Sequence, residues 1–291
     1  MSPGPRRRAG PSTRRPPVVV VGMGRLGGAL ALALQAKRWP VRIHSRTAAG
    51  RQRAEALGLK AASPADLKRA RVVLLCVPDA SVPSVAQALS TTLPRTAALV
   101  HTAGALPLDA LGTTRGRTRG SFHPLCAVSS PHDSLAGSTV AVSTPSRALR
   151  DVLRRMAADA GLRVIEVPEA HRAAYHAGAV LSAGGLVSLA DAAVAALGAS
   201  GIPPADALAA LLPLMHSALR GLETRGLAGG LTGPIVRGDS GVVAAHLEAL
   251  PADVAPLYRL LSLGEPPGAA AASECAGGRH AGLGAGLLYR Q

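Results

Sequence analysis

The sequence predicts an α/β domain with a doubly wound parallel sheet, followed by an all-α C-terminal domain. Between residues 16 and 168, short apolar segments alternate with helical segments. This alternation is typical of a parallel sheet with helices on both faces. From residue 169 the strand signals end, and long segments rich in alanine and leucine take over. A chain of 291 residues is also long enough for about two domains.

The expected strands are short runs of valine, leucine, isoleucine and alanine. They lie at 18–21, 41–44, 72–77, 97–101, 138–143 and 163–167, with a weaker strand near 58–61. Helices are expected at 29–36 and 81–90, and in the second domain at 169–198, 204–224, 239–250 and 252–263. Because they lack a steady hydrophobic period, we predict disordered tails at 1–15 and 266–291. The sheet domain is then 16–168 and the helical domain 169–265.

Four valines at 18–21 run directly into the pattern G-x-G-x-x-G and then into a helical run from Ala29. Such glycines let the backbone turn tightly and approach a pyrophosphate held at the N-terminus of the following helix. We therefore predict a Rossmann-type dinucleotide site. The residues expected to bind the cofactor here are Gly22, Met23, Gly24, Arg25, Leu26 and Gly27.

The tip of the second strand indicates which dinucleotide binds. An NAD site usually places Asp or Glu about 20 residues after the glycines, for the ribose 2'-hydroxyl. This chain has no carboxylate before Glu55 and offers Ser45, Arg46 and Thr47 instead. Guanidinium and hydroxyl donors suit a dianionic 2'-phosphate. The sequence therefore predicts NADP as the cofactor.

In a parallel sheet, ligands bind beyond the carboxyl ends of the strands. Val77 and Pro78 end the strand 72–77 and are expected beside the nicotinamide half of the cofactor. His101 and Thr102 end the strand 97–101 and are expected to contact ribose or carboxamide. His123, next to a proline, is a candidate proton donor or orienting group. A purely structural histidine is the alternative.

The first long helix of the second domain carries Tyr175, His176 and Ser182. Residues three or four apart share one face of a helix, so Tyr175 and Ser182 can point into one cleft with His176 beside it. We expect Tyr175 to bind substrate, and His176 and Ser182 to be catalytic candidates. The alternative is a packing face of small residues.

The segment 231–241 is expected to be a loop that enters a helix, with Asp239 or Ser240 as its N-cap. The amides of the helix and Arg237 form a candidate site for a substrate carboxylate. Thr232 in the same segment is a further catalytic candidate, and Asp239 and Ser240 are candidate substrate ligands. An ordinary connection between helices is the alternative.

The formal charge of +15 does not by itself indicate nucleic-acid binding, because only 2% of the residues are aromatic and they do not interleave with the arginines as base stacking would need. The basic run 115–119 is expected to be a solvated loop, with contact to an anionic ligand or another surface as the alternative. Three unpaired cysteines predict neither a disulfide framework nor a metal site and fit the cytoplasm. The apolar run 177–190 is too short to span a bilayer, so we expect no membrane partner.

Several motifs together resemble a bacterial group of Rossmann-like oxidoreductases with a C-terminal domain of unknown function, distant relatives of pyrroline-5-carboxylate reductase and ketopantoate reductase. The more specific motifs are His101-Thr102-Ala103-Gly104, His123-Pro124-Leu125, Tyr175-His176 and Leu231-Thr232-Gly233-Pro234, with Arg237-Gly238-Asp239 and His246. The resemblance covers about residues 16–263. It implies an NADP-binding domain, a helical domain that forms a homodimer, and an active site in the cleft between them.

These observations lead us to expect an NADP(H)-dependent oxidoreductase that reduces a small-molecule substrate at a C=O or C=N bond. Ketopantoate reductase and the β-hydroxyacid dehydrogenases use a lysine of the helical domain, and this chain has none after Lys68. The group tends to have asparagine at Gly184 and threonine at Val242, so two polar groups are missing here. These departures favour the alternative, an NADP-binding regulatory protein that has lost turnover.

Overall fold

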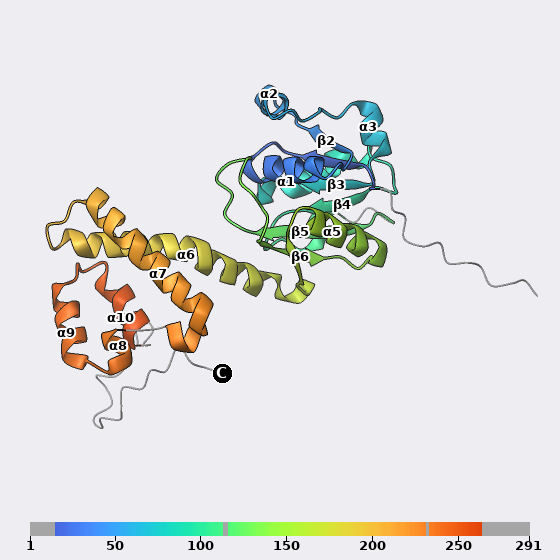
Figure 1. The fold of residues 1–291 in the computed structure, drawn as a ribbon. Coiled ribbons are helices and arrows are strands. Elements are labelled where there is room, and N and C mark those ends of the chain that lie inside the picture. The colour runs from blue at the N-terminus through green and yellow to red at the C-terminus, as the bar shows by residue number, and fades with distance from the viewer. Residues whose placement is uncertain (1–14, 113–115, 231–232, 264–291) are drawn as a thin grey trace, which may run out of the picture. The chain divides into compact units, whose positions relative to one another are not determined.

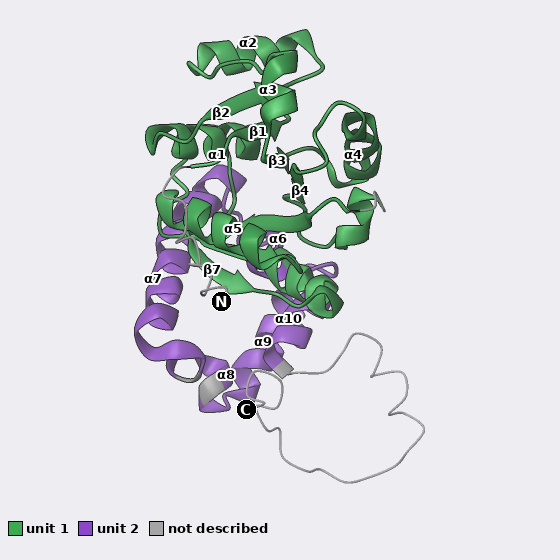
Figure 2. Ribbon diagram, turned by 90° about the vertical axis from the view of Figure 1, so that its right-hand side faces the viewer, with its two compact units in different colours: residues 1–180 green, residues 181–291 purple. Residues whose placement is uncertain are grey.

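The computed structural model describes residues 15–112, 116–230 and 233–263. Apart from Arg15, the tails predicted at 1–15 and 266–291 lie outside these residues. The chain divides into two compact units, residues 1–180 and 181–291 (Figure 2). The sequence predicts the domain boundary at 168/169, before the long helix that begins the second domain.

A seven-stranded sheet forms the centre of the first unit. Its strands are β1 (Val18–Val21), β2 (Val41–His44), β3 (Val72–Leu75), β4 (Ala98–His101), β5 (Arg119–Leu125), β6 (Thr139–Ser143) and β7 (Arg163–Glu166). The spatial order is β2-β1-β3-β4-β5-β6-β7, and every neighbouring pair is parallel except β5 and β6. The predicted fold class, a Rossmann-type sheet followed by a helical region, is confirmed. The weaker strand expected near 58–61 is reduced to a single bridge between Ile43 and Ala61.

Strand β5 is not among the strands that the sequence predicts. Gly120, His123 and Pro124 interrupt the run of β-formers in its sequence. The strand tolerates Pro124 because its pairing with β4 ends at Ser121, opposite His101. Beyond that point only the β6 side is paired, so a residue without an amide hydrogen is accommodated there. β6 is the next element after β5 in the chain, and these two strands pair antiparallel.

Helices cover both faces of the sheet, as the alternating side chains of β1 require. Val18 and Val20 belong to one apolar core, with residues of α1 (Arg25–Ala36), α2 (Ala48–Ala56) and α5 (Arg147–Asp159). Figure 1 labels these three helices. Val19 and Val21 belong to the other core, with α3 (Pro64–Arg69) and α4 (Val82–Ser90). In the sheet, β1 lies between β2 and β3, and the chain leaves toward opposite faces of the sheet on its two sides. Doubly wound sheets bind ligands at the carboxyl ends of the strands at such a point.

The described part of the basic run 115–119, residues 116–119, is not a solvated loop, because it leads into β5 and buries Arg117. Arg117 is only 8% exposed, and its guanidinium donates to the carbonyl oxygens of Ser90, Leu93, Pro94 and Ala97. The last carbonyl groups of a helix receive no hydrogen bond from within the helix, so a guanidinium beside them supplies the missing donors. Arg117 therefore fixes the C-terminal end of α4 to the sheet.

The second unit is helical. Its elements are α7 (Pro204–Gly230), α8 (Pro234–Arg237), α9 (Ser240–Ala249) and α10 (Ala255–Leu263), and it also contains most of α6 (Arg172–Gly198). Helix α7 begins at Pro204, where proline fits the first turn. At Gly226 the backbone leaves the helical region, with φ +69° and ψ −172°, so α7 is two helices joined at a kink.

Helix α6 is longer than the apolar run 177–190 alone indicates. A continuous helical stretch over 169–198 has a mean hydropathy of 1.8 and is the one candidate of sufficient length and composition to cross a membrane among the described residues. Core and interface helices of soluble proteins meet the same criterion. Large apolar side chains such as Leu181 and Val187 are 74% and 70% exposed on it.

Candidate functional site

The three glycines after β1 differ in how much space their neighbours leave for a side chain. A Cβ on Gly22, where φ is +98°, would lie 2.3 Å from the carbonyl oxygen of Cys76, and a Cβ on Gly27 would lie 2.2 Å from that of Gly22. Both positions must be glycine for the turn and for close packing of α1 on the sheet. A Cβ on Gly24 would meet nothing within 4 Å. Gly24 is also the N-cap of α1 and makes no side-chain cap, so the first amides of the helix are left for a ligand.

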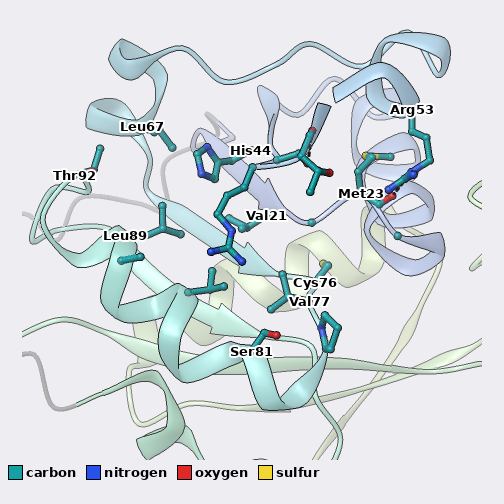
Figure 3. A pocket seen from close by; sticks show the side chains of 18 residues that line it. Val21, Met23, His44, Arg53, Leu67, Cys76, Val77, Ser81, Leu89 and Thr92 are labelled. Atoms are coloured by element: carbon teal, nitrogen blue, oxygen red, sulfur yellow. Dashed lines mark hydrogen bonds between the residues drawn. The ribbon is translucent and has the colours of Figure 1, made fainter. Parts of the chain in front are cut away.

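A cavity of about 420 Å³ opens at the carboxyl ends of β1, β2 and β3 (Figure 3). Eight of the predicted cofactor residues line it, and five do not. The lining residues are Gly22, Met23, Gly24, Ser45, Arg46, Thr47, Val77 and Pro78. The others are Arg25, Leu26, Gly27, His101 and Thr102.

One end of the cavity is basic and rich in donors. Thr47 caps α2 by accepting a hydrogen bond from the Gly50 amide at 3.1 Å, and Gly50 lets Ser45 lie against this turn. Arg53, which no sequence motif indicated, donates from Nε to the carbonyl oxygen of Met23 at 3.1 Å. It thereby ties α2 to the glycine-rich loop. Among the described residues that line the cavity there is no aspartate or glutamate.

The opposite end of the cavity is apolar. Leu67 of α3, and Val85 and Leu89 of α4, line it, and Leu67 and Leu89 lie across the cavity from Met23 and Arg53 (Figure 3). An apolar wall at one end and donors at the other suit a ligand with a flat ring and an anionic group. The apolar face of the helix predicted at 81–90 was the available signal for this wall. Its contact with a ligand site could not be foreseen from the spacing.

A second polar cluster lies at the carboxyl ends of β4 and β5. Tyr175 and His176, on the first turns of α6, approach His123 of β5. His123 Nδ1 and Tyr175 Oη lie 2.7 Å apart, and the His123 and His176 rings are 5.6 Å apart between centroids. Gly104 makes room for His176, because a Cβ there would lie 2.1 Å from His176 Nδ1. The structure thus brings together three of the predicted site residues from two distant segments.

Arg172 holds this cluster and was not predicted. It is 2% exposed and donates to Ser121 Oγ at 2.6 Å and to the carbonyl oxygens of Ala103 and Gly104 at 2.6 and 2.9 Å. These bonds join the start of α6 to β5 and to the segment after β4. Glu169 adds to the anchor by accepting hydrogen bonds from the Leu108 amide and from Ser143. A single arginine before an apolar helix gives no distinguishing signal in the sequence.

His123 and the neighbouring His101 are neutral at pH 7. Burial, with a contribution from His176 and Arg172, lowers the pKa of His123 to about 4. Burial and Arg172 likewise lower the pKa of His101 to about 4. Burial raises the pKa of Tyr175, and the nearby charge of Arg172 opposes this rise.

His101 and Thr102 are buried, and neither lines the cavity as the structure stands. His101 is 0% exposed, and both of its ring nitrogens are without a hydrogen-bond partner. Thr102 donates its hydroxyl to the carbonyl oxygen of Leu75 at 3.2 Å. Their predicted contact with ribose or carboxamide stays a prediction.

The remaining predicted site residues belong to the second unit. Ser182 is exposed on α6, and Thr232 lies outside the described residues. Asp239 is the N-cap of α9 but makes no side-chain cap; it pairs instead with Arg237, at 3.0 Å. Ser240 is the first residue of α9. Their roles toward a substrate stay predictions.

The cysteines do not form a reactive site in the part of the chain that the structure describes. Cys76 and Cys126 are both free thiols. Burial raises the pKa of Cys76 to about 12, which keeps it protonated. The described residues contain no group of three or more side chains suited to hold a metal ion.

Two family models match the sequence. Residues 3–124 match the Rossmann-like domain, and residues 138–264 match a domain of unknown function, DUF2520. Among curated proteins, none matches this chain. The two matches agree with the resemblance to Rossmann-like oxidoreductases that carry such a C-terminal domain.

Solved structures extend the likeness over most of the chain. BF3122 of Bacteroides fragilis, assigned as an NADP oxidoreductase, is 25% identical, with 85% of this chain and 96% of that chain covered and a TM-score of 0.69. Protein TM1727 of Thermotoga maritima is 26% identical, with coverages of 79% and 88% and a TM-score of 0.63. A 1-pyrroline-5-carboxylate reductase of Streptococcus pyogenes, 18% identical, shares the fold, with coverages of 83% and 94% and a TM-score of 0.59. The chain therefore combines a Rossmann-like domain with a C-terminal DUF2520 domain.

Proposed function

We propose that this protein is an NADP(H)-dependent oxidoreductase that reduces a small C=O or C=N substrate. The observation that carries the proposal is the cavity at the end of β1. It joins the exposed amides at Gly24 to the donors of Ser45, Arg46 and Arg53, and its described lining contains no carboxylate. A 2'-phosphate carries two negative charges, so this combination favours NADP over NAD.

The residues present fit such a cofactor. The open space at Gly24 and the first amides of α1 would receive the pyrophosphate. Leu67 and Leu89 would pack against the adenine, and Ser45, Arg46 and Arg53 would bind the 2'-phosphate. When bound, the nicotinamide supplies a hydride; the chain contributes orientation and a proton.

The cofactor preference can be tested by titrating the full chain with NADPH and NADH and following nucleotide fluorescence. We expect R46D to weaken NADPH binding by roughly 10- to 150-fold, from the loss of about 1.5–3 kcal/mol for a charged hydrogen bond, with little effect on NADH binding. The matched control is R147D, which makes the same charge change at an exposed residue that begins α5 and does not line the cavity. An unchanged preference in R46D would remove Arg46 from the phosphate site.

Turnover needs a separate assay. NADPH oxidation at 340 nm is followed with glyoxylate and methylglyoxal as carbonyl probes and 1-pyrroline as an imine probe. Reduction of any of them supports the oxidoreductase. NADPH binding with no oxidation on the whole panel would favour the regulatory alternative that Gly184 and Val242 raise.

We further propose that the protein is cytoplasmic and that its helical unit forms a homodimer. Leu181, Val187, Leu214 and Leu227 are between 65% and 74% exposed in the single chain, and apolar surface of this kind marks interfaces. Sedimentation equilibrium without detergent should give a dimer, and V187D should shift it toward monomer. The control I165D alters a residue of β7 in the first unit and should remain dimeric. A chain that stays soluble only in detergent would instead indicate a membrane partner for α6.

A further inference from the structure

We infer that Tyr175 is the proton donor of the proposed reductase, that neutral His123 holds its hydroxyl by donating from Nδ1, and that the substrate is an aldehyde or ketone. This inference rests on the proposed function and assigns roles within it. From the sequence alone, we expect His123 or His176 to donate the proton to the substrate, and Tyr175 only to bind the substrate.

The geometry singles out the pair. His123 Nδ1 and Tyr175 Oη are 2.7 Å apart with their rings at 90°, an edge-on arrangement in which one ring nitrogen meets one hydroxyl. The pair lies where β5 ends and α6 begins, beyond the carboxyl end of the sheet. Both side chains are only half-buried, so a substrate can reach the hydroxyl.

Protonation decides which member of the pair is the acid. His123 has a pKa of about 4 and is therefore neutral at pH 7. A neutral imidazole N–H is a much weaker acid than a phenol, so His123 is the poorer proton donor of the two. Tyr175 keeps its phenolic proton at pH 7, because burial raises its pKa. When Nδ1–H donates to Tyr175 Oη, the phenolic proton is free to point at a substrate. The charged and titratable groups facing the pair are Arg172 and His176 from α6 and His101 from β4.

The charge of Arg172 favours a carbonyl over an imine. Hydride addition to C=O moves the π electron pair onto oxygen, and the alkoxide takes the proton from Tyr175 Oη. The tyrosinate left behind accepts the His123 N–H, is stabilised by the buried Arg172, and regains a proton from water. An imine must instead become a cationic iminium to accept hydride, and the same arginine disfavours that cation.

Rigid support distinguishes the pair from a chance surface contact. Arg172 anchors the first residue of α6 through three hydrogen bonds while 2% exposed. Gly104 lets the His176 ring pack beside His123. These contacts hold Tyr175 at a set position relative to β5. Arg172 is thus a positioning residue, and Tyr175 the catalytic one.

The chain contains its own control. His246 Nδ1 and Tyr258 Oη in the second unit are also 2.7 Å apart, with centroids 5.7 Å apart. We expect Y175F to lower kcat on the carbonyl probes at least about 100-fold with the NADPH Kd unchanged, and Y258F to leave both unchanged. Reduction of 1-pyrroline faster than of either carbonyl probe, or a Y175F kcat within twofold of wild type, would overturn the inference.

A second readout needs no substrate. In the full chain labelled with ¹⁵N-histidine, assigned with H123Q, His123 should be neutral with a proton on Nδ1 at pH 7. A proton on Nε2 alone would mean that Tyr175 donates to His123, which overturns the inference even if no probe is reduced. Failure of NADPH to bind would refute the proposed function separately, and the histidine spectrum would still decide the pair.

Discussion

Replacing Arg172 by methionine removes the donors that anchor the start of α6 but keeps the length of the side chain. Three acceptors lose their partner: Ser121 Oγ and the carbonyl oxygens of Ala103 and Gly104. Hydrogen bonds from a charged donor contribute about 1.5–3 kcal/mol each, so the gross loss is roughly 5–9 kcal/mol. Burying a guanidinium costs several kcal/mol, which methionine avoids. The net loss in free energy of unfolding is therefore about 2–4 kcal/mol.

Urea denaturation followed by tryptophan fluorescence measures this loss. Trp39 is the one tryptophan of the chain, is 3% exposed and lies in the first unit, so its signal reports that unit. R71M is the matched control, because exposed Arg71 makes a side-chain hydrogen bond to exposed Thr96, and its loss should cost less than about 0.5 kcal/mol. If R172M were as stable as R71M, the anchoring role of Arg172 would be refuted.

Three further predictions concern the same unit. G22A should abolish NADPH binding in a fluorescence titration, because its Cβ would clash with the backbone of Cys76, whereas G58A, at positive φ but in open space, should bind normally. R117M should lower the midpoint of urea unfolding and cost about 2 kcal/mol, since the carbonyl oxygen of the last residue of α4 and three more in the segment between α4 and β4 lose their donor; an unchanged midpoint would contradict this role. His101 and His123 have folded pKa values of about 4 against 6.5 when unfolded, so the unfolded chain binds more protons between these values, and stability should fall as pH falls from 6.5 to 4, by up to about 3 kcal/mol per histidine. A pH-independent urea midpoint over this range would show that these histidines are not buried neutral.

The parts of the fold that follow from local patterns were predictable. The valine strand, the glycine turn and the second strand tip at Arg46 lie close together in sequence, and the cavity joins them. Six of the strands, and Pro204 as the start of α7, follow from the same kind of signal. Strand β5 does not, because Pro124 is tolerated there only through the absence of a β4 neighbour, which is a tertiary fact.

The polar cluster of His123, Tyr175 and His176 shows what the sequence could not predict, namely which distant residues contact each other. His123 and Tyr175 were each singled out, but residues 52 positions apart give no sign that they share a hydrogen bond. Arg117 and Arg172 were missed for a related reason. An arginine that caps carbonyls in the interior has the same sequence signature as one in water, and only the fold distinguishes them.

The most direct test of the central claim compares two fragments of the cofactor, 2',5'-ADP and 5'-AMP, by isothermal titration against the full chain. They differ in the 2'-phosphate, so the comparison isolates the contribution of the donors Ser45, Arg46 and Arg53 that line the cavity. We predict that 2',5'-ADP binds at least about 10-fold more tightly, or about 1.4 kcal/mol, with the difference lost in R46D. Equal or tighter binding of 5'-AMP would contradict an NADP site.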